Sequence, residues 1–173
     1  PSKNSAVWSQ PGRDPQFAGE RIPALQEVFD LLNARLFLNI EIKERSVRDT
    51  GIERAVVERI EANHLSERVI VSSFNPWSVW RVKRVDCRIR TGFLYAKATP
   101  AWPGRLAGVN AVHPHFVLLT RATIEAEHAR AMLVNTWTVN EAEDMTAMLA
   151  LGVDAIITNY PDRLRALLRD FAR

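Results

Sequence analysis

An acidic and a basic side chain, Glu41 and Lys43, stand two residues apart at the end of an apolar run. In a β-strand alternate side chains point to opposite faces, so this pair shares one face with Asn39, and Ile40 and Ile42 share the other. A hard divalent cation prefers carboxylate oxygens, which makes Glu41 a candidate metal ligand. A salt bridge between Glu41 and Lys43 is the structural alternative, and the residues alone leave both interpretations open.

Aromatic and imidazole side chains stand at the ends of other predicted strands. Phe74 and Trp137 are in such positions, where core packing is the default role. His113 also ends a strand, and two residues later comes His115, but no cysteine or acidic residue joins them in sequence as a metal site would require. We expect a structural or substrate-edge role for His113, a surface role for His115, and a weaker candidate in Asn159. Four other tryptophans are expected to be packing residues or loop anchors: Trp8, Trp77, Trp80 and Trp102.

Length and composition indicate an ordinary globular protein. The 173 residues are enough for a single domain over 1–173, and the formal net charge is +3. The nearest approach to a basic cluster is expected to be a solvated helix end and strand start, so nucleic-acid binding is not predicted. This cluster comprises Arg81, Lys83, Arg84, Arg88 and Arg90.

The single cysteine, Cys87, excludes an internal disulfide and favours a reducing compartment, with the cytoplasm preferred. No run approaches the ~20 apolar residues of a transmembrane helix. The chain starts at Pro1 in a polar stretch without a signal-peptide pattern, so we expect it to begin within a longer protein.

Strand and helix patterns alternate after a loop-rich opening segment, residues 1–21. Strands are predicted at 36–43, 69–74, 90–95, 111–114, 132–139 and 153–158. Helices are predicted to begin at Pro23 and Pro161 and to span 47–62, 76–85, 121–131 and 140–151, the last with a capping box of Asn140 and Glu143. This alternation predicts parallel strands, in either an open doubly wound sheet or most of a (β/α)8 barrel. No Gly-rich phosphate loop follows the first strand, which disfavours nucleotide binding.

Five segments together resemble the glycerophosphodiester phosphodiesterase family. They are residues 17–28, 38–43, 71–76, 137–140 and 152–162. The resemblance implies a (β/α)8 TIM barrel that hydrolyses glycerophosphodiesters to glycerol 3-phosphate and an alcohol, with a divalent metal, Mg or Ca. Another lipid-cleaving barrel phosphodiesterase is a less favoured alternative.

The chain also departs from the family pattern. The His-Arg-Gly strand, the Glu-x-Asp strand and the His-Asp pair of the family are absent from it. The resemblance therefore implies an incomplete barrel, the C-terminal part of the family fold with about six of eight strands. It also implies that the acid/base histidines and two metal carboxylates are missing.

The resemblance gives roles to four residues. Glu41 matches a metal-binding glutamate, and Lys43 matches a lysine that stabilises charge on the phosphate and so serves in catalysis and substrate binding. Phe74 and Trp137 match residues that enclose the glycerol part of the substrate. We expect the chain alone to be inactive, because its general acid/base is absent. The alternative is a non-catalytic partial barrel that binds partners or assembles, for instance as a homo-oligomer.

Overall fold

The computed structural model describes residues 21–32, 36–96, 103–104 and 107–171. The chain divides into two compact units, residues 1–33 and 34–173, and each is described by itself. In the first unit, α1 (Leu25–Leu32) carries Glu27 in its first turn, and this glutamate pairs with Arg21. The single domain expected over 1–173 stays a prediction, and the loop expected over 1–21 lies almost wholly outside the described residues.

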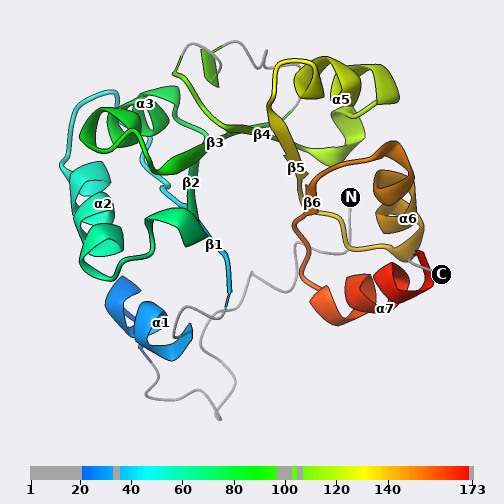
Figure 1. The fold of residues 1–173 in the computed structure, drawn as a ribbon, viewed down its shortest axis with the longest axis horizontal. Helices are drawn as coiled ribbons and strands as arrows, with labels where there is room; N and C mark the ends of the chain where they lie inside the picture. The colour runs from blue at the N-terminus through cyan, green and yellow to red at the C-terminus, as the bar shows by residue number, and fades with distance from the viewer. Residues whose placement is uncertain (1–20, 33–35, 97–102, 105–106, 172–173) are drawn as a thin grey trace. The chain divides into compact units, whose positions relative to one another are not determined.

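The second unit is built on one sheet of six parallel strands. Their order in the sheet follows the chain, and Figure 1 shows the sheet curled into a half-barrel with helices on its outer side. Each strand connects to the next by a crossover, as parallel neighbours require. The strands are β1 (Leu38–Glu41), β2 (Val69–Ser73), β3 (Arg90–Tyr95), β4 (Ala111–Pro114), β5 (Leu133–Thr136) and β6 (Ala155–Ile156).

Helices occupy most of the crossovers, as the alternating pattern predicts. The α-helices are α2 (Ile52–Ala62), α3 (Pro76–Val85), α5 (Arg121–His128), α6 (Ala142–Leu151) and α7 (Pro161–Phe171). Two short 3-10 helices, η3 (Ser66–Arg68) and η4 (Phe116–Leu118), were not expected from the sequence.

The apolar core lies between the sheet and the helices. Phe93, Val112 and Val134 leave the outer face of three neighbouring strands and pack with Val79 of α3 and Ile124 of α5, all buried. Burying such side chains stabilises the fold by about 1.5–3 kcal/mol each. These contacts join the helices to the outer face of the sheet.

Polar side chains line the inner face of the curled sheet. Ser72 Oγ donates to Asn39 Oδ1 at 2.8 Å, and the Asn135 side-chain amide lies 3.0 Å from His113 Nε2. These residues alternate with the core residues along each strand. The core side chains therefore point to the helices, and the polar side chains point to the interior of the half-barrel.

Several element boundaries differ from the sequence predictions. The helix predicted over 47–62 begins only at Ile52, because Ser46 and Asp49 side chains accept hydrogen bonds from nearby backbone N–H groups and Gly51 adopts φ +81°. Side-chain bonds of this kind compete with helix formation. The strands predicted over 132–139 and 153–158 are shorter, at 133–136 and 155–156.

A side-chain cap and a glycine set the ends of two of the helices. Asn75 caps α3, since its side chain accepts from the Trp77 N–H at 3.0 Å, and Gly152 ends α6 at φ +86°. The capping box at Asn140 is wrong: α6 begins after Glu141, and the Asn140 side chain instead accepts from the Asn159 N–H.

Candidate active site

A cavity of about 390 Å³ lies at the carboxyl ends of β1 and β2. In barrels of parallel strands, this end carries the catalytic groups. Three of the four predicted site residues line the cavity, namely Glu41, Lys43 and Phe74. The full lining is Glu41, Ile42, Lys43, Glu44, Arg45, Ser73 and Phe74.

Glu41 and Lys43 form an ion pair at the cavity. Lys43 Nζ lies 3.0 Å from Glu41 Oε1, with the lysine side chain 79% exposed and the glutamate 30% exposed. Between them Ile42 is buried, and its N–H donates to Ser72 O at 2.8 Å. The backbone is thus anchored to β2, while both charged ends remain accessible to a ligand.

The strand end next to this pair is held by side-chain hydrogen bonds. Ser73 Oγ donates to Ile42 O at 2.7 Å and accepts from the Asn75 N–H at 3.1 Å. These bonds tie the end of β1 to the start of α3, and Phe74 lies between the two bonded residues. The position of Phe74 at the cavity therefore follows from the strand-to-helix turn.

Trp137 reaches this region from the end of β5. Its ring lies edge to face with Phe74, with centroids 5.4 Å apart, and edge to face with His115 at 5.0 Å. Its indole Nε1 donates to His113 O at 2.7 Å. The indole is therefore held by contacts from several segments. Phe74, which it touches, lines the same cavity as Glu41 and Lys43.

Two charged neighbours in the cavity, Glu44 and Arg45, were not singled out in the sequence. Glu44 accepts from the Ser46 N–H at 2.6 Å and from Thr50 Oγ1 at 3.2 Å, and the backbone bond from Ser46 is the main reason that the pKa of Glu44 is lowered. Its oxygens are engaged in holding the loop. The sequence feature that could have identified both residues is their position directly after a predicted strand.

The histidines that end β4 occupy different environments. His113 is fully buried in the interior, and burial lowers its pKa to about 4, so its imidazole is neutral near pH 7. His115 stacks on Phe116 with centroids 4.9 Å apart and contacts Trp137. Neither lines the cavity, and Asn159 is engaged through its backbone N–H at Asn140.

The described residues do not by themselves fit a divalent metal. Glu41 offers one carboxylate with one oxygen already facing Lys43, and Glu44 is engaged with its own loop. Within the described ranges, no group of three or more His, Cys, Asp or Glu side chains could hold an ion. Hard cations such as Ca²⁺ require six to eight oxygen ligands.

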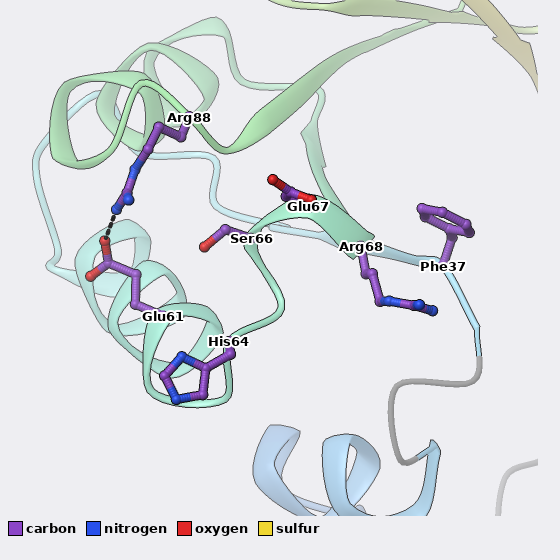
Figure 2. A pocket seen from close by; sticks show the side chains of 7 residues that line it. All are labelled: Phe37, Glu61, His64, Ser66, Glu67, Arg68 and Arg88. Atoms are coloured by element: carbon purple, nitrogen blue, oxygen red, sulfur yellow. Dashed lines mark hydrogen bonds and ion pairs between the residues drawn. The ribbon is translucent and has the colours of Figure 1, made fainter.

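A larger cavity of about 630 Å³ opens at the opposite end of the strands. Figure 2 shows its lining, in which Arg88 pairs with Glu61 at 3.1 Å and Arg68 lies near Phe37. It lies where β2 begins, not at the catalytic end of a barrel. We therefore do not assign the chemistry to it. Among the described residues, no helix combines the length and apolar composition needed to cross a membrane.

Comparison with known proteins gives consistent matches. The model of the "Glycerophosphoryl diester phosphodiesterase family" matches residues 7–163. A glycerophosphodiester phosphodiesterase of Caldanaerobacter subterraneus is 38% identical over 157 residues, covering 89% of this chain and 65% of the relative. The chain thus spans less than two thirds of the length of that relative.

Solved structures match the same fold. A Silicibacter pomeroyi protein, provisionally assigned as a glycerophosphoryl diester phosphodiesterase, superposes with a TM-score of 0.80 at 26% identity, covering 88% of this chain and 58% of that one. An Oleispira antarctica phosphodiesterase, solved with the product sn-glycerol-3-phosphate, gives a TM-score of 0.70 at 21% identity, covering 86% and 62%. The half-barrel therefore corresponds to part of a TIM-barrel fold, as the sequence predicted.

Proposed function

Because the chain belongs to the glycerophosphoryl diester phosphodiesterase family, we propose that it forms part of a site that hydrolyses glycerophosphodiesters to glycerol 3-phosphate and an alcohol. One observation carries the proposal: Glu41, Lys43 and Phe74 line a single cavity at the carboxyl ends of β1 and β2. An anion-binding cation, a carboxylate and an aromatic surface are the groups that a glycerol phosphate ester would contact.

Lys43 is proposed to bind the phosphoryl oxygens. Its ammonium is a compact charge with three donors, and it stabilises negative charge that builds on the phosphoryl group in the transition state. Glu41, 3.0 Å away, orients the ammonium at the cavity. Because Lys43 is largely exposed, its remaining donors can turn to a ligand.

Phe74 and Trp137 are proposed to pack against the glycerol part of the substrate. Their edge-to-face contact at 5.4 Å gives a firm apolar surface beside the charged pair. The Oleispira antarctica structure with sn-glycerol-3-phosphate supports that molecule as the probe for this chain.

Glu41 is also proposed as one carboxylate ligand of Mg²⁺ or Ca²⁺, since hard cations prefer carboxylate oxygens. The described residues supply too few ligands to complete such a site, so further ligands would have to come from outside them. A reducing compartment, with the cytoplasm favoured, is part of the same proposal and rests on the single free cysteine, Cys87.

The proposal predicts that Lys43→Gln weakens binding of glycerol 3-phosphate to the chain about tenfold or more, since a hydrogen bond to a charged group contributes about 1.5–3 kcal/mol. Titration calorimetry at low ionic strength measures the affinity. Arg165→Gln, an exposed charge removed from α7, is the matched control and should leave the affinity unchanged. Equal weakening by both variants would assign the binding to net charge and contradict a role specific to Lys43.

A second candidate function is a partial barrel that assembles with another chain. The observation favouring it is the open strand order, with β1 and β6 at the two ends of the sheet. Each end strand has one side without a strand neighbour in the described sheet, and such edges pair readily with other strands. A homo-oligomer that covers these edges is the simplest form of this candidate.

A further inference from the structure

Helix α3 carries two tryptophans that face solvent rather than the core. Trp77 is 51% exposed and Trp80 is 40% exposed, and their rings touch edge to face with centroids 6.1 Å apart. The inward side of the same helix buries Ser78, Val79 and Val82. The expectation that these tryptophans are packing residues is therefore met only in part, and each presents much of its ring to the outside.

Arginine and valine extend this exposed surface. The Arg84 guanidinium lies 5.4 Å from the centroid of the Trp80 ring, and Val47, in the loop before α2, is 68% exposed. That loop is tied to α3, because the Asn75 side chain donates to Ser46 O at 2.8 Å and Arg81 donates to Val47 O. We call the surface formed by Val47, Trp77, Trp80 and Arg84 the α3 face.

The charge beside the α3 face is positive. Arg45 and Arg48 are exposed in the same loop, and among the described residues no ion pair joins them or Arg84 to a carboxylate. The nearby acids are engaged locally. Glu53 is buried against Arg81, and Asp86 at the end of α3 pairs with Arg88. Glu44 and Asp49 accept backbone N–H groups of their own loop, which does not remove their charge, so three exposed arginines face two carboxylates and leave an excess of one positive charge.

We propose that the α3 face docks on an anionic phospholipid surface. Tryptophan has an apolar ring with one polar N–H, and it favours the boundary between headgroups and acyl chains. Arginines beside it are attracted to anionic lipid headgroups. Tryptophan beside basic residues is a combination that recurs on the membrane-facing side of interfacial helices, and the outward side of α3 presents it.

The size of the surface favours a lipid over a protein partner. A stable protein interface buries about 800 Å² on each partner. Two half-exposed tryptophans offer about 200 Å², since an aromatic side chain buries about 150–250 Å² in all. This area is small for a protein interface, whereas a bilayer can accept a shallow insertion of two rings.

The part of the α3 face around Trp77 lies at the catalytic end of the sheet, whereas Arg84, in the last turn of α3, lies toward the other end. Helix α3 begins three residues after Ser73 ends β2, and Phe74 of the proposed site lies in the connection. Docking through the first turns of α3 would bring the cavity mouth near the lipid surface. The proposal concerns a separate surface and does not require that the cavity bind glycerophosphodiesters.

Vesicle binding tests the proposal directly. The 173-residue chain is sedimented with phosphatidylcholine vesicles and with vesicles containing phosphatidylglycerol as well, at low and at physiological salt. We expect binding to the anionic vesicles, a blue shift of tryptophan fluorescence, and weaker binding at higher salt. Arg84→Gln should lower the partition about fivefold, since each basic group near the surface contributes about that factor. The double variant, with both Trp77→Gln and Trp80→Gln, should lose the blue shift.

Matched variants separate this surface from general charge and apolarity. Arg165→Gln removes an exposed arginine on α7, and Val117→Ser removes a 67% exposed apolar side chain in η4. Both should bind vesicles as the unaltered chain does, and circular dichroism checks that every variant is folded. Absence of binding to anionic vesicles, or equal loss in the controls, would overturn the proposal. Self-association that disappears with the tryptophan pair, without vesicle binding, would assign the face to a second copy and also overturn it.

Discussion

His113 is a buried titratable residue on the inner face of the half-barrel. Its ring lies across Gly92, where a Cβ atom would come within 2.4 Å of Nε2, so only glycine leaves room for the imidazole. Nε2 faces the Asn135 amide at 3.0 Å, and the His113 carbonyl accepts from Trp137. His113 therefore holds Trp137 through its carbonyl but does not itself line the cavity.

The lowered pKa of His113 predicts how the free energy of unfolding depends on pH. Burial lowers it from 6.5 to about 4 in the folded protein. Between these values the unfolded chain binds a proton that the folded protein does not, so the free energy of unfolding rises with pH up to about 6.5 and then levels off. The contribution is about 3.5 kcal/mol at most, at about 1.4 kcal/mol per pKa unit.

Urea unfolding of His113→Gln across this pH range checks the prediction. The variant should lose the part of the pH dependence that corresponds to one proton, because glutamine does not titrate. His64→Asn is the control. His64 is exposed just after the end of α2, and its φ of +56° is one that asparagine adopts readily. If both variants keep the same slope as the unaltered chain, His113 is not the group responsible.

At the scale of elements, the turn from β2 into α3 is where site and fold meet. Asn75 serves both, because its side chain accepts from the Trp77 N–H at 3.0 Å and donates to Ser46 O at 2.8 Å. One residue thus caps the helix and fixes the loop beside the cavity. Local side-chain hydrogen bonds, more than helix propensity, decide where this part of the chain turns.

Replacing Asn75 by alanine should lower the free energy of unfolding by about 1–2 kcal/mol, because both hydrogen bonds are lost and a cap is worth about 0.5–2 kcal/mol. Chemical denaturation measures the change. Asn159→Ala, in an exposed asparagine after β6, is the matched substitution and should have little effect. Similar losses in the two variants would mean that the cap does not contribute specifically.

At the scale of the whole molecule, the absence of the family's His-Arg-Gly, Glu-x-Asp and His-Asp motifs from these 173 residues bears on activity. We predict little or no hydrolysis of glycerophosphocholine by this chain with Mg²⁺ or Ca²⁺, because the family resemblance places the general acid for the leaving alkoxide in those motifs. Release of choline measures turnover. Turnover that Glu41→Ala abolishes would refute the predicted inactivity.

The open order of the sheet gives a second prediction at this scale. If the ends at β1 and β6 pair with another copy, the fraction of dimer should rise with the concentration of the chain. Size-exclusion chromatography with light scattering at several concentrations measures this. A monomer throughout would exclude the self-assembling form of the second candidate function.

The sequence determined the repeating strands and helices and the residues that end the strands. Alternation of apolar and polar residues is local information, so Glu41 could be separated from Ile42 and all six strands could be found without a structure. The same information did not fix the start of α2 or the environment of Asn140, since these depend on competing hydrogen bonds made once neighbouring elements are in place.

Only the tertiary structure decided which side chains meet. Phe74 and Trp137 are 63 positions apart in the chain (137 minus 74) and touch because β2 and β5 belong to one curled sheet. The exposure of Trp77 and Trp80 was likewise settled by which side of α3 faces the sheet. Periodicity predicts that one face of an element is buried, but contacts between distant elements arise only when the sheet curls and brings them together.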